Sequence, residues 1–157
     1  MSELPLEERV ARLEAVEALK RLKARYCAYC DNNYDPEGLA SLFTQKGVWD
    51  GETFGRYVGR DEIKSFFQRT SGNIIFAAHL VLNPIIEIKD ADHAIGEWRL
   101  IMPATVQENR QKEARWLIAA YDERYVRVDG AWFFELLKLH VNFYEPHAIG
   151  WAHSAVL

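Results

Sequence analysis

Four long segments rich in β-branched and aromatic residues make up most of the second half of the chain. They span residues 74–88, 94–106, 114–128 and 131–144. Short polar breaks separate them, and the last break contains Asp129-Gly130, a dipeptide typical of tight β-hairpin turns. Long segments of this composition joined by hairpin turns predict an antiparallel meander. We expect the residues before it to cover one face of this sheet.

The first 70 residues carry helical patterns. Apolar residues recur every three or four positions over residues 6–29, which predicts one amphipathic helix that ends near Asn32-Asn33. Asp35 and Pro36 have the residue types of a helix N-cap and first helical position, so a second helix is expected there. Residues 59–70 predict a third helix, after two short strands.

Helices followed by long strands indicate the α+β class. We predict a cone-shaped, curved sheet, mixed or antiparallel, that forms a half-barrel packed by three N-terminal helices. Pro84 and Pro103 lie inside strands, where proline favours bulges or bends that curl a sheet. The 157 residues suit a single domain, so we expect residues 1–157 to form one unit with one interior pocket.

Charge and composition narrow the class of function. The net charge is −4 and no basic block stands apart, which argues against a nucleic-acid partner. The chain contains neither a long uncharged apolar run nor a signal-peptide core, so we expect no membrane association and a cytoplasmic protein. Two cysteines provide no disulfide framework, as expected in a reducing compartment.

Cys27 and Cys30 form a Cys-x-x-Cys pair at the C-terminal end of the first predicted helix. The helix dipole raises a thiol pKa there, whereas reactive pairs lie at helix N-termini. We therefore expect both thiols to pack in the core. The five histidines are scattered and no second cysteine pair exists, so we expect neither a metal nor another cofactor.

Asp31 and His79 are the two residues that local structure explains least. Asp31 falls in the last turn of a helix, where a carboxylate opposes the macrodipole. His79 is the lone ionisable residue in the apolar first part of the segment 74–88. An imidazole oriented by a carboxylate is a base suited to neutral pH, so the pair is a candidate catalytic dyad.

The chain resembles the nuclear transport factor 2-like superfamily, and within it the SnoaL-like, or polyketide-cyclase-like, group. The resemblance rests on residues 17–43 as opening helices, 58–67 as the third, and the four strands with 123–144 closing the sheet. Within the group it is similar to hexachlorocyclohexane dehydrochlorinases, bile-acid dehydratases and, more distantly, scytalone dehydratases. The resemblance implies a cystatin-like fold for the whole of 1–157.

The resemblance also implies site residues and a reaction. The catalytic pair of the group matches Asp31 and His79, and a contributing tyrosine of the bile-acid enzymes matches Tyr26. A basic residue near the end of their last strand is replaced here by Asn142. The implied activity is that of a lyase: cofactor-independent β-elimination, as dehydration or dehydrohalogenation, on a small hydrophobic cyclic molecule. Tyr26 or Asn142 would assist the leaving group.

Aromatic residues are expected to line the pocket and bind substrate. The candidates lie on the predicted strands and turns: Trp98, Trp116, Tyr57, Phe54 and Phe143. A pocket of this composition suits a hydrophobic ligand.

Other functions remain open from the sequence. In a ketosteroid-isomerase-like or cyclase-type proton transfer, Asp50 would be the base and Tyr26 the oxyanion donor, with Asp122 a poor match for the second acid. A second alternative is a non-catalytic module that binds a small ligand or assembles like a dioxygenase small subunit; it predicts a filled or shallow cone. Family resemblance further predicts a homo-oligomer, a dimer or trimer.

Overall fold

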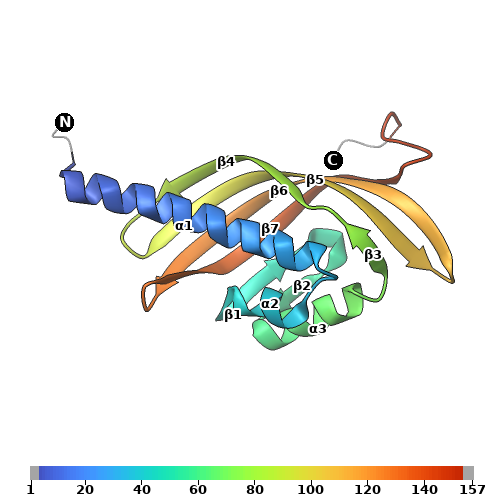
Figure 1. The fold of residues 1–157 in the computed structure, drawn as a ribbon, viewed down its shortest axis with the longest axis horizontal. Coiled ribbons are helices and arrows are strands. Elements are labelled where there is room, and N and C mark those ends of the chain that lie inside the picture. The colour runs from blue at the N-terminus through green and yellow to red at the C-terminus, as the bar shows by residue number, and fades with distance from the viewer. Residues whose placement is uncertain (1–3, 154–157) are drawn as a thin grey trace.

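The computed structural model describes residues 4–153, and its elements follow the predicted order (Figure 1). The helices are α1 (Leu6–Asp31), α2 (Pro36–Ser41) and α3 (Arg60–Thr70), with a 3-10 turn η1 (Glu52–Phe54). The strands are β1 (Phe43–Asp50), β2 (Arg56–Val58), β3 (Ile74–Ala77), β4 (Leu80–Ile88), β5 (His93–Glu108), β6 (Gln111–Val128) and β7 (Ala131–Pro146). The predicted helices and hairpin turns are confirmed.

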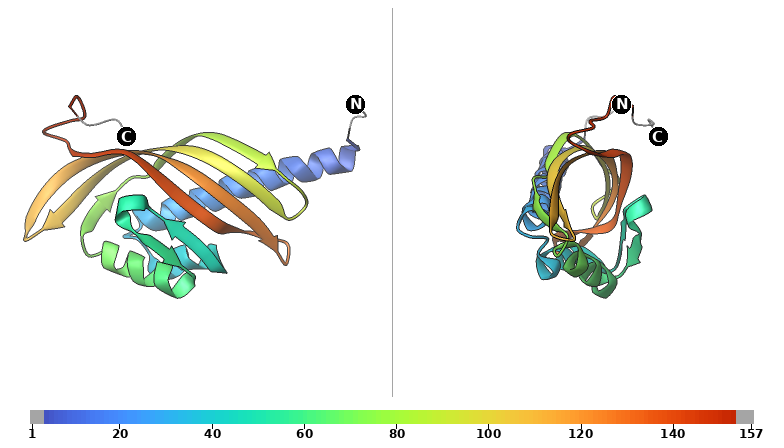
Figure 2. Two further views of the ribbon diagram at one scale, coloured as in Figure 1. Left: turned by 180° about the vertical axis from the view of Figure 1, so that it is seen from behind. Right: turned by 90° about the vertical axis from the view of Figure 1, so that its right-hand side faces the viewer.

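All strands belong to one mixed sheet of seven strands. Its order is β2-β1-β7-β6-β5-β3, and β4 also pairs with β5. The pairing of β1 with β7 is parallel, and the other pairings are antiparallel. The long strands curl strongly, as the end-on view in Figure 2 shows, with the helices along the concave side. The predicted α+β half-barrel is therefore confirmed.

The second helix begins where the sequence predicts. The Asp35 side chain accepts a hydrogen bond from the backbone N–H of Gly38 at 3.1 Å, and Pro36 occupies the first helical position. This N-cap satisfies one of the free N–H groups at the helix start. The N-cap role explains why an aspartate stands at position 35, but no comparable local role explains Asp31.

The fully buried residues of α1 all lie in its C-terminal half. The buried residues of this helix are Leu19, Leu22, Lys23, Tyr26, Cys27 and Cys30. The first turns extend past the strands (Figure 1), so Leu6, Val10 and Leu13 remain 67%, 43% and 70% exposed. The predicted helix is confirmed in its extent, but the apolar residues of its first turns are not buried, because the sheet ends before the helix does.

The predicted strand 74–88 is broken by two residues, Ala78 and His79, into β3 and β4. The bulge expected at Pro84 is confirmed: the pairing with β5 shifts register between Leu82 and Ile85. This break and shift bend the edge of the sheet.

Pro103 produces no bulge in its own strand. It stays in register with Trp116 of β6, and its carbonyl accepts a hydrogen bond from the backbone N–H of Ala78. In an antiparallel pair, the N–H and C=O of one residue point to the same neighbouring strand. The N–H that Pro103 lacks would therefore point toward Ala78, in the break between β3 and β4. The irregularity expected at Pro103 therefore falls on the neighbouring edge strands.

No helix within residues 4–153 is both long and apolar enough to cross a membrane.

Candidate functional site

A cavity of about 210 Å³ lies inside the curved sheet. Most of its walls are aromatic or aliphatic: Tyr26, Tyr34, Trp49, Phe54, Phe66, Phe67, Ile74, Leu100, Met102, Leu117, Tyr121, Leu139 and Tyr144. The other lining residues are Thr70, Asn73 and His79. An apolar cavity with a few polar groups is the usual form of a small-molecule site.

The structure brings the two residues of the predicted dyad together. Asp31 is the last residue of α1, and His79 lies in the break between β3 and β4. Nδ1 of His79 is 2.7 Å from Oδ1 of Asp31. The backbone N–H of His79 also donates to Oδ1 and Oδ2 of Asp31, at 2.9 and 3.1 Å. Three contacts to one carboxylate therefore fix both the position and the rotation of the imidazole.

These contacts determine which ring nitrogen of His79 is available. A carboxylate acceptor at Nδ1 favours the tautomer that carries its proton there, which leaves a lone pair on Nε2. Within residues 4–153, Asp31 is the one hydrogen-bond partner of this ring. The His79 side chain is 5% exposed, whereas that of Asp31 is 37% exposed. The unprotonated nitrogen is thus free at a largely apolar cavity, and its carboxylate partner lies toward solvent.

Tyr34 forms one side of the histidine site and is not among the residues predicted from the sequence. Its ring meets the imidazole of His79 edge to face, with centroids 5.8 Å apart, and stacks on Phe67 at 6.0 Å. Its backbone φ is +50°, in the left-handed region that bulky residues rarely adopt. Such strain often occurs at functional sites. A sequence signal was available, since Tyr34 directly follows the predicted helix end.

Tyr26 and Phe54 line the cavity, as predicted. The Tyr26 hydroxyl accepts a hydrogen bond from Nε1 of Trp49 at 2.9 Å. Burial raises the pKa of the Tyr26 phenol well above its usual range. The hydroxyl therefore keeps its proton at neutral pH and can act as a donor.

Two other predicted wall residues lie behind the cavity. Trp98 is buried, and its Nε1 donates to the hydroxyl of Tyr125 at 3.0 Å. Tyr57 stacks on Phe66 with ring centroids 4.3 Å apart, so that Phe66 separates it from the space. Trp98 is buried in the core and Tyr57 is half-buried, and neither borders the cavity.

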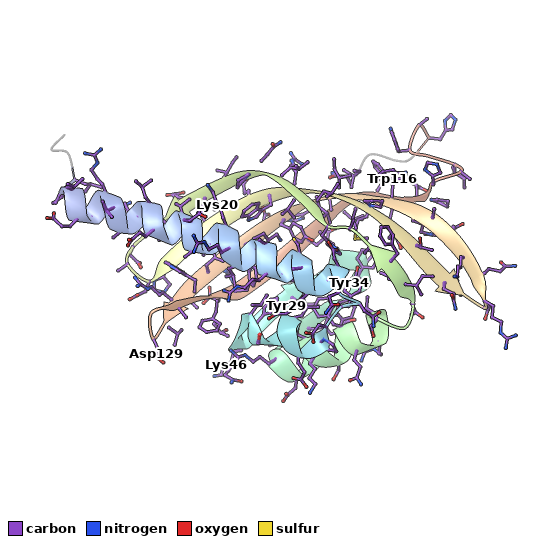
Figure 3. The ribbon with its side chains drawn as sticks, in the orientation of Figure 1. Lys20, Tyr29, Tyr34, Lys46, Trp116 and Asp129 are labelled. Carbon is purple, nitrogen blue, oxygen red and sulfur yellow. The ribbon has the colours of Figure 1, made fainter. Side chains whose placement is uncertain are left out.

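Trp116 and Phe143 lie with the C-terminal segment, away from the cavity. Nε1 of Trp116 donates to Nδ1 of His147 at 2.9 Å, and Phe143 stacks on Trp151 at 5.7 Å. Figure 3 shows Trp116 beside this segment and apart from Tyr34, which lies in the turn after α1. The expectation that these two aromatic residues form the walls is therefore corrected.

Asn142 occupies an irregular position in β7. The pairing of β7 with β6 passes from Phe143 opposite Ile118 to Val141 opposite Ala119, so Asn142 is an extra, unpaired residue. It is not among the residues that line the cavity. Because an extra residue reverses the alternation of side chains, the faces of residues near it could not be read from the sequence.

The carboxylates of the isomerase alternative lie elsewhere. Asp50 accepts a hydrogen bond from the backbone N–H of Glu52 at 3.1 Å and pairs with Arg56 at 3.6 Å. Asp122 contacts Nε2 of His140 at 2.7 Å. Neither carboxylate lines the cavity, so the geometry gives Asp50 no contact with a ligand held beside Tyr26.

The two cysteines are buried and unpaired with each other. Burial raises the pKa of the Cys27 thiol to about 11, and burial likewise raises the pKa of Cys30. Both thiols are therefore protonated and poorly reactive at neutral pH. Within residues 4–153, no group of three or more His, Cys, Asp or Glu side chains is arranged to hold a metal ion.

The family model of the SnoaL-like domain matches residues 11–138. This chain belongs to that family. No protein of curated function matches its sequence.

Solved structures support the same fold. The hexachlorocyclohexane dehydrochlorinase LinA-type3 from Novosphingobium barchaimii LL02 has a TM-score of 0.80 and 23% identity, with 89% of this chain and 94% of that one covered. A proposed scytalone dehydratase from Novosphingobium aromaticivorans has a TM-score of 0.79 and 22% identity, covering 88% and 91%. A nuclear-transport-factor-2-like protein with a cystatin-like fold, also from Novosphingobium aromaticivorans, has a TM-score of 0.67 and 18% identity, covering 89% and 92%. Dehydrochlorinases and dehydratases therefore share this fold.

Proposed function

We propose that this protein is a lyase that catalyses β-elimination, a dehydration or dehydrohalogenation, on a small hydrophobic cyclic molecule. The observation that carries the proposal is the 2.7 Å contact between Nδ1 of His79 and Asp31 at the wall of an apolar cavity. The same fold in a dehydrochlorinase and in a proposed scytalone dehydratase supports it. The reaction needs a base, a dry pocket and help for the leaving group.

His79 is the base in this mechanism. Its Nε2 removes a proton from the carbon next to the one that carries the leaving group, and the C–H electron pair forms the double bond. The imidazolium that results is stabilised by Asp31, whose carboxylate already accepts the Nδ1 proton.

The leaving group departs with the electrons of its bond to carbon. A halide leaves as the anion, and the proton on His79 is later lost to solvent. A hydroxyl group leaves as water after the imidazolium has returned its proton to the departing oxygen. Both routes balance without any further reactant. Of the two predicted assisting residues, Tyr26 lies in the cavity wall and Asn142 does not.

The open cavity supports a small-molecule site over an assembly role. A non-catalytic assembly module was expected to have a filled or shallow cone, whereas this one holds about 210 Å³ of space. The volume suits a compact ring better than an extended chain.

We also propose that the protein forms a homo-oligomer, a dimer or trimer. Several large apolar side chains of β3, β4 and β5 are exposed: Ile75, Phe76, Leu80, Leu82, Ile85 and Ile95. Exposed apolar side chains gathered on adjacent strands commonly mark an interface. Light scattering at micromolar concentration tests this, and a monomer would contradict it.

The test of function compares wild type with His79→Gln on two probes, hexachlorocyclohexane and scytalone. Chloride release and dehydration are measured directly. We expect turnover of at least one probe, and a fall in kcat of at least about 10³-fold in the variant because the base is lost. Equal turnover by the two proteins would contradict the proposal, and so would the absence of elimination across these and related cyclic halides and alcohols.

A further inference from the structure

A buried polar network lies next to the cavity and has no part in the dyad. Lys23 of α1 and Glu123 of β6 form a direct ion pair, with both side chains fully buried. The Tyr125 hydroxyl donates to the second oxygen of Glu123. Nε1 of Trp98 donates to that hydroxyl at 3.0 Å. Each member of the network is therefore hydrogen-bonded within the core.

An ion pair in the core is costly. Removing two charges from water costs several kcal/mol for each, which their attraction only partly offsets, so well-packed apolar residues often do as well or better. The pair is therefore not explained by stability alone. The Lys23–Glu123 pair is distinguished by its contact with an aromatic ring of the cavity wall.

Lys23 holds a ring of the cavity wall. Its Nζ lies 3.2 Å from the centroid of the Tyr121 ring and 4.9 Å from that of Tyr26, and both rings line the cavity. An ammonium group over an aromatic face is attracted by the ring, more strongly where water is excluded. Glu123 fixes the ammonium, and the ammonium fixes the Tyr121 ring.

The hydroxyl of Tyr121 is left for a ligand. Within residues 4–153 it forms no hydrogen bond, and no fully buried side-chain nitrogen or oxygen in the same range lacks a partner. The oxygen must therefore reach the open space of the cavity. Burial raises the pKa of the Tyr121 phenol, so the group keeps its proton. It is a fixed, unused hydrogen-bond donor in the cavity that contains His79.

We propose that Tyr121 donates a hydrogen bond to the leaving group, or to an anionic oxygen of a ligand, and that the Lys23–Glu123 pair is its positioning device. In the elimination, the hydrogen bond shortens as the bond from carbon to halide or oxygen breaks and negative charge builds on the departing atom. No proton needs to leave Tyr121. The catalytic part of this inference rests on the function proposed above, but the binding of an anionic oxygen does not.

The experiment uses two ring compounds that differ in one group, 4-nitrophenolate and nitrobenzene. Calorimetric titrations are made with wild type, Tyr121→Phe and Tyr29→Phe, at a pH that ionises the phenol. Tyr29→Phe is the matched control, because it removes a hydroxyl from the same protein outside the cavity wall. We expect Tyr121→Phe to weaken 4-nitrophenolate binding roughly tenfold or more and nitrobenzene binding less than about twofold. Tyr29→Phe should change neither.

A paired variant tests the positioning role. Lys23→Met with Glu123→Gln removes both buried charges together, so neither is left unpaired. We expect it to weaken 4-nitrophenolate binding about threefold to tenfold in wild type, and to add no loss in the Tyr121→Phe background, as a double-mutant cycle requires for groups that act together. Additive losses would overturn the positioning role. If this variant does not fold, Lys23→Arg, which keeps the charge but moves it on the ring, takes its place with the same expectation.

The outcomes separate this inference from the proposed function. Equal losses of both ligands in Tyr121→Phe, or no loss of either, would overturn the role of Tyr121 whatever His79 does. Unchanged turnover in His79→Gln would overturn the elimination mechanism and leave a selective loss of 4-nitrophenolate intact. Where elimination is measurable, Tyr121→Phe should lower kcat about 10²-fold with KM nearly unchanged.

Discussion

His79 and His140 contact carboxylates at almost the same distance, yet their surroundings differ. His79 lies in the cavity wall with Asp31 at Nδ1 and with Nε2 free. His140 of β7 contacts Glu52 through Nδ1 at 2.9 Å and Asp122 through Nε2 at 2.7 Å. Its side chain is 36% exposed, against 5% for His79.

The difference shows that a His–Asp contact alone does not make a catalytic base. Both nitrogens of His140 are occupied, so its imidazole can only hold other groups in place. Glu52 also accepts a hydrogen bond from the backbone N–H of Val141 at 3.1 Å, which joins η1 to β7. The pair in the cavity is suited to proton transfer, and the cluster on the exposed face is suited to structure.

The largest expected effect comes from changing one carboxylate in each region. Asp31→Asn should lower kcat for elimination roughly 10³-fold, because an amide neither stabilises the imidazolium nor selects the same tautomer. Asp122→Asn makes the same chemical change beside His140 and should leave kcat within about twofold. Steady-state kinetics on whichever probe is turned over measures both. Similar losses in the two variants would show that the regions are not distinct in function.

A smaller effect is expected from Glu52→Gln. The substitution removes the charge that holds η1 against His140, while η1 also carries Phe54 of the cavity wall. Since the pair is partly exposed, we expect a loss of about 0.5 to 1 kcal/mol in the free energy of unfolding and a rise in KM of a few-fold, with kcat nearly unchanged. Urea denaturation and kinetics measure these. The control, Glu14→Gln on the exposed part of α1, should change neither, and a large fall in kcat would contradict a purely structural role.

The smallest effect concerns a third histidine, His93, which is the first residue of β5. A hydrogen bond and the charge of Asp90 raise the pKa of His93. A raised pKa in the folded state stabilises the fold below the unfolded pKa, and that contribution is lost as the pH rises through the folded value. His93→Gln should therefore lower the melting temperature slightly near pH 5 and not near pH 9. His153→Gln is the control, and a larger deficit at the higher pH would show that the sign is wrong.

The dyad was predictable because each member was anomalous in its local context. Asp31 opposes the helix dipole at the end of α1, and His79 is the lone ionisable group among apolar neighbours. Because neither residue has a local structural role, each is expected to interact with a residue distant in sequence. The fold class followed from the order of helical and strand patterns, with hairpin turns at the predicted places.

The walls of the cavity were less predictable, for a physical reason. In a regular strand, alternate residues point to the same face of the sheet, so the face can be predicted from the sequence. The break before Leu80 and the extra residue Asn142 interrupt this alternation. Trp116 and Phe143 were assigned to the cavity on composition, although the strands turn them away from it. Tyr34 and Tyr121 were missed because their roles depend on a left-handed backbone and on a buried lysine. Pairing between distant segments, such as β1 with β7, leaves no local pattern.

The empty space beside His79 ties the folding stability of the protein to its ligand. The apolar walls of this cavity lack the free energy of packing that a filled core would have provided. A molecule that fills the cavity recovers part of this free energy, because it binds the folded chain and not the unfolded one. The melting temperature is therefore a direct reading of occupancy, and it can rank cyclic compounds before any reaction is known.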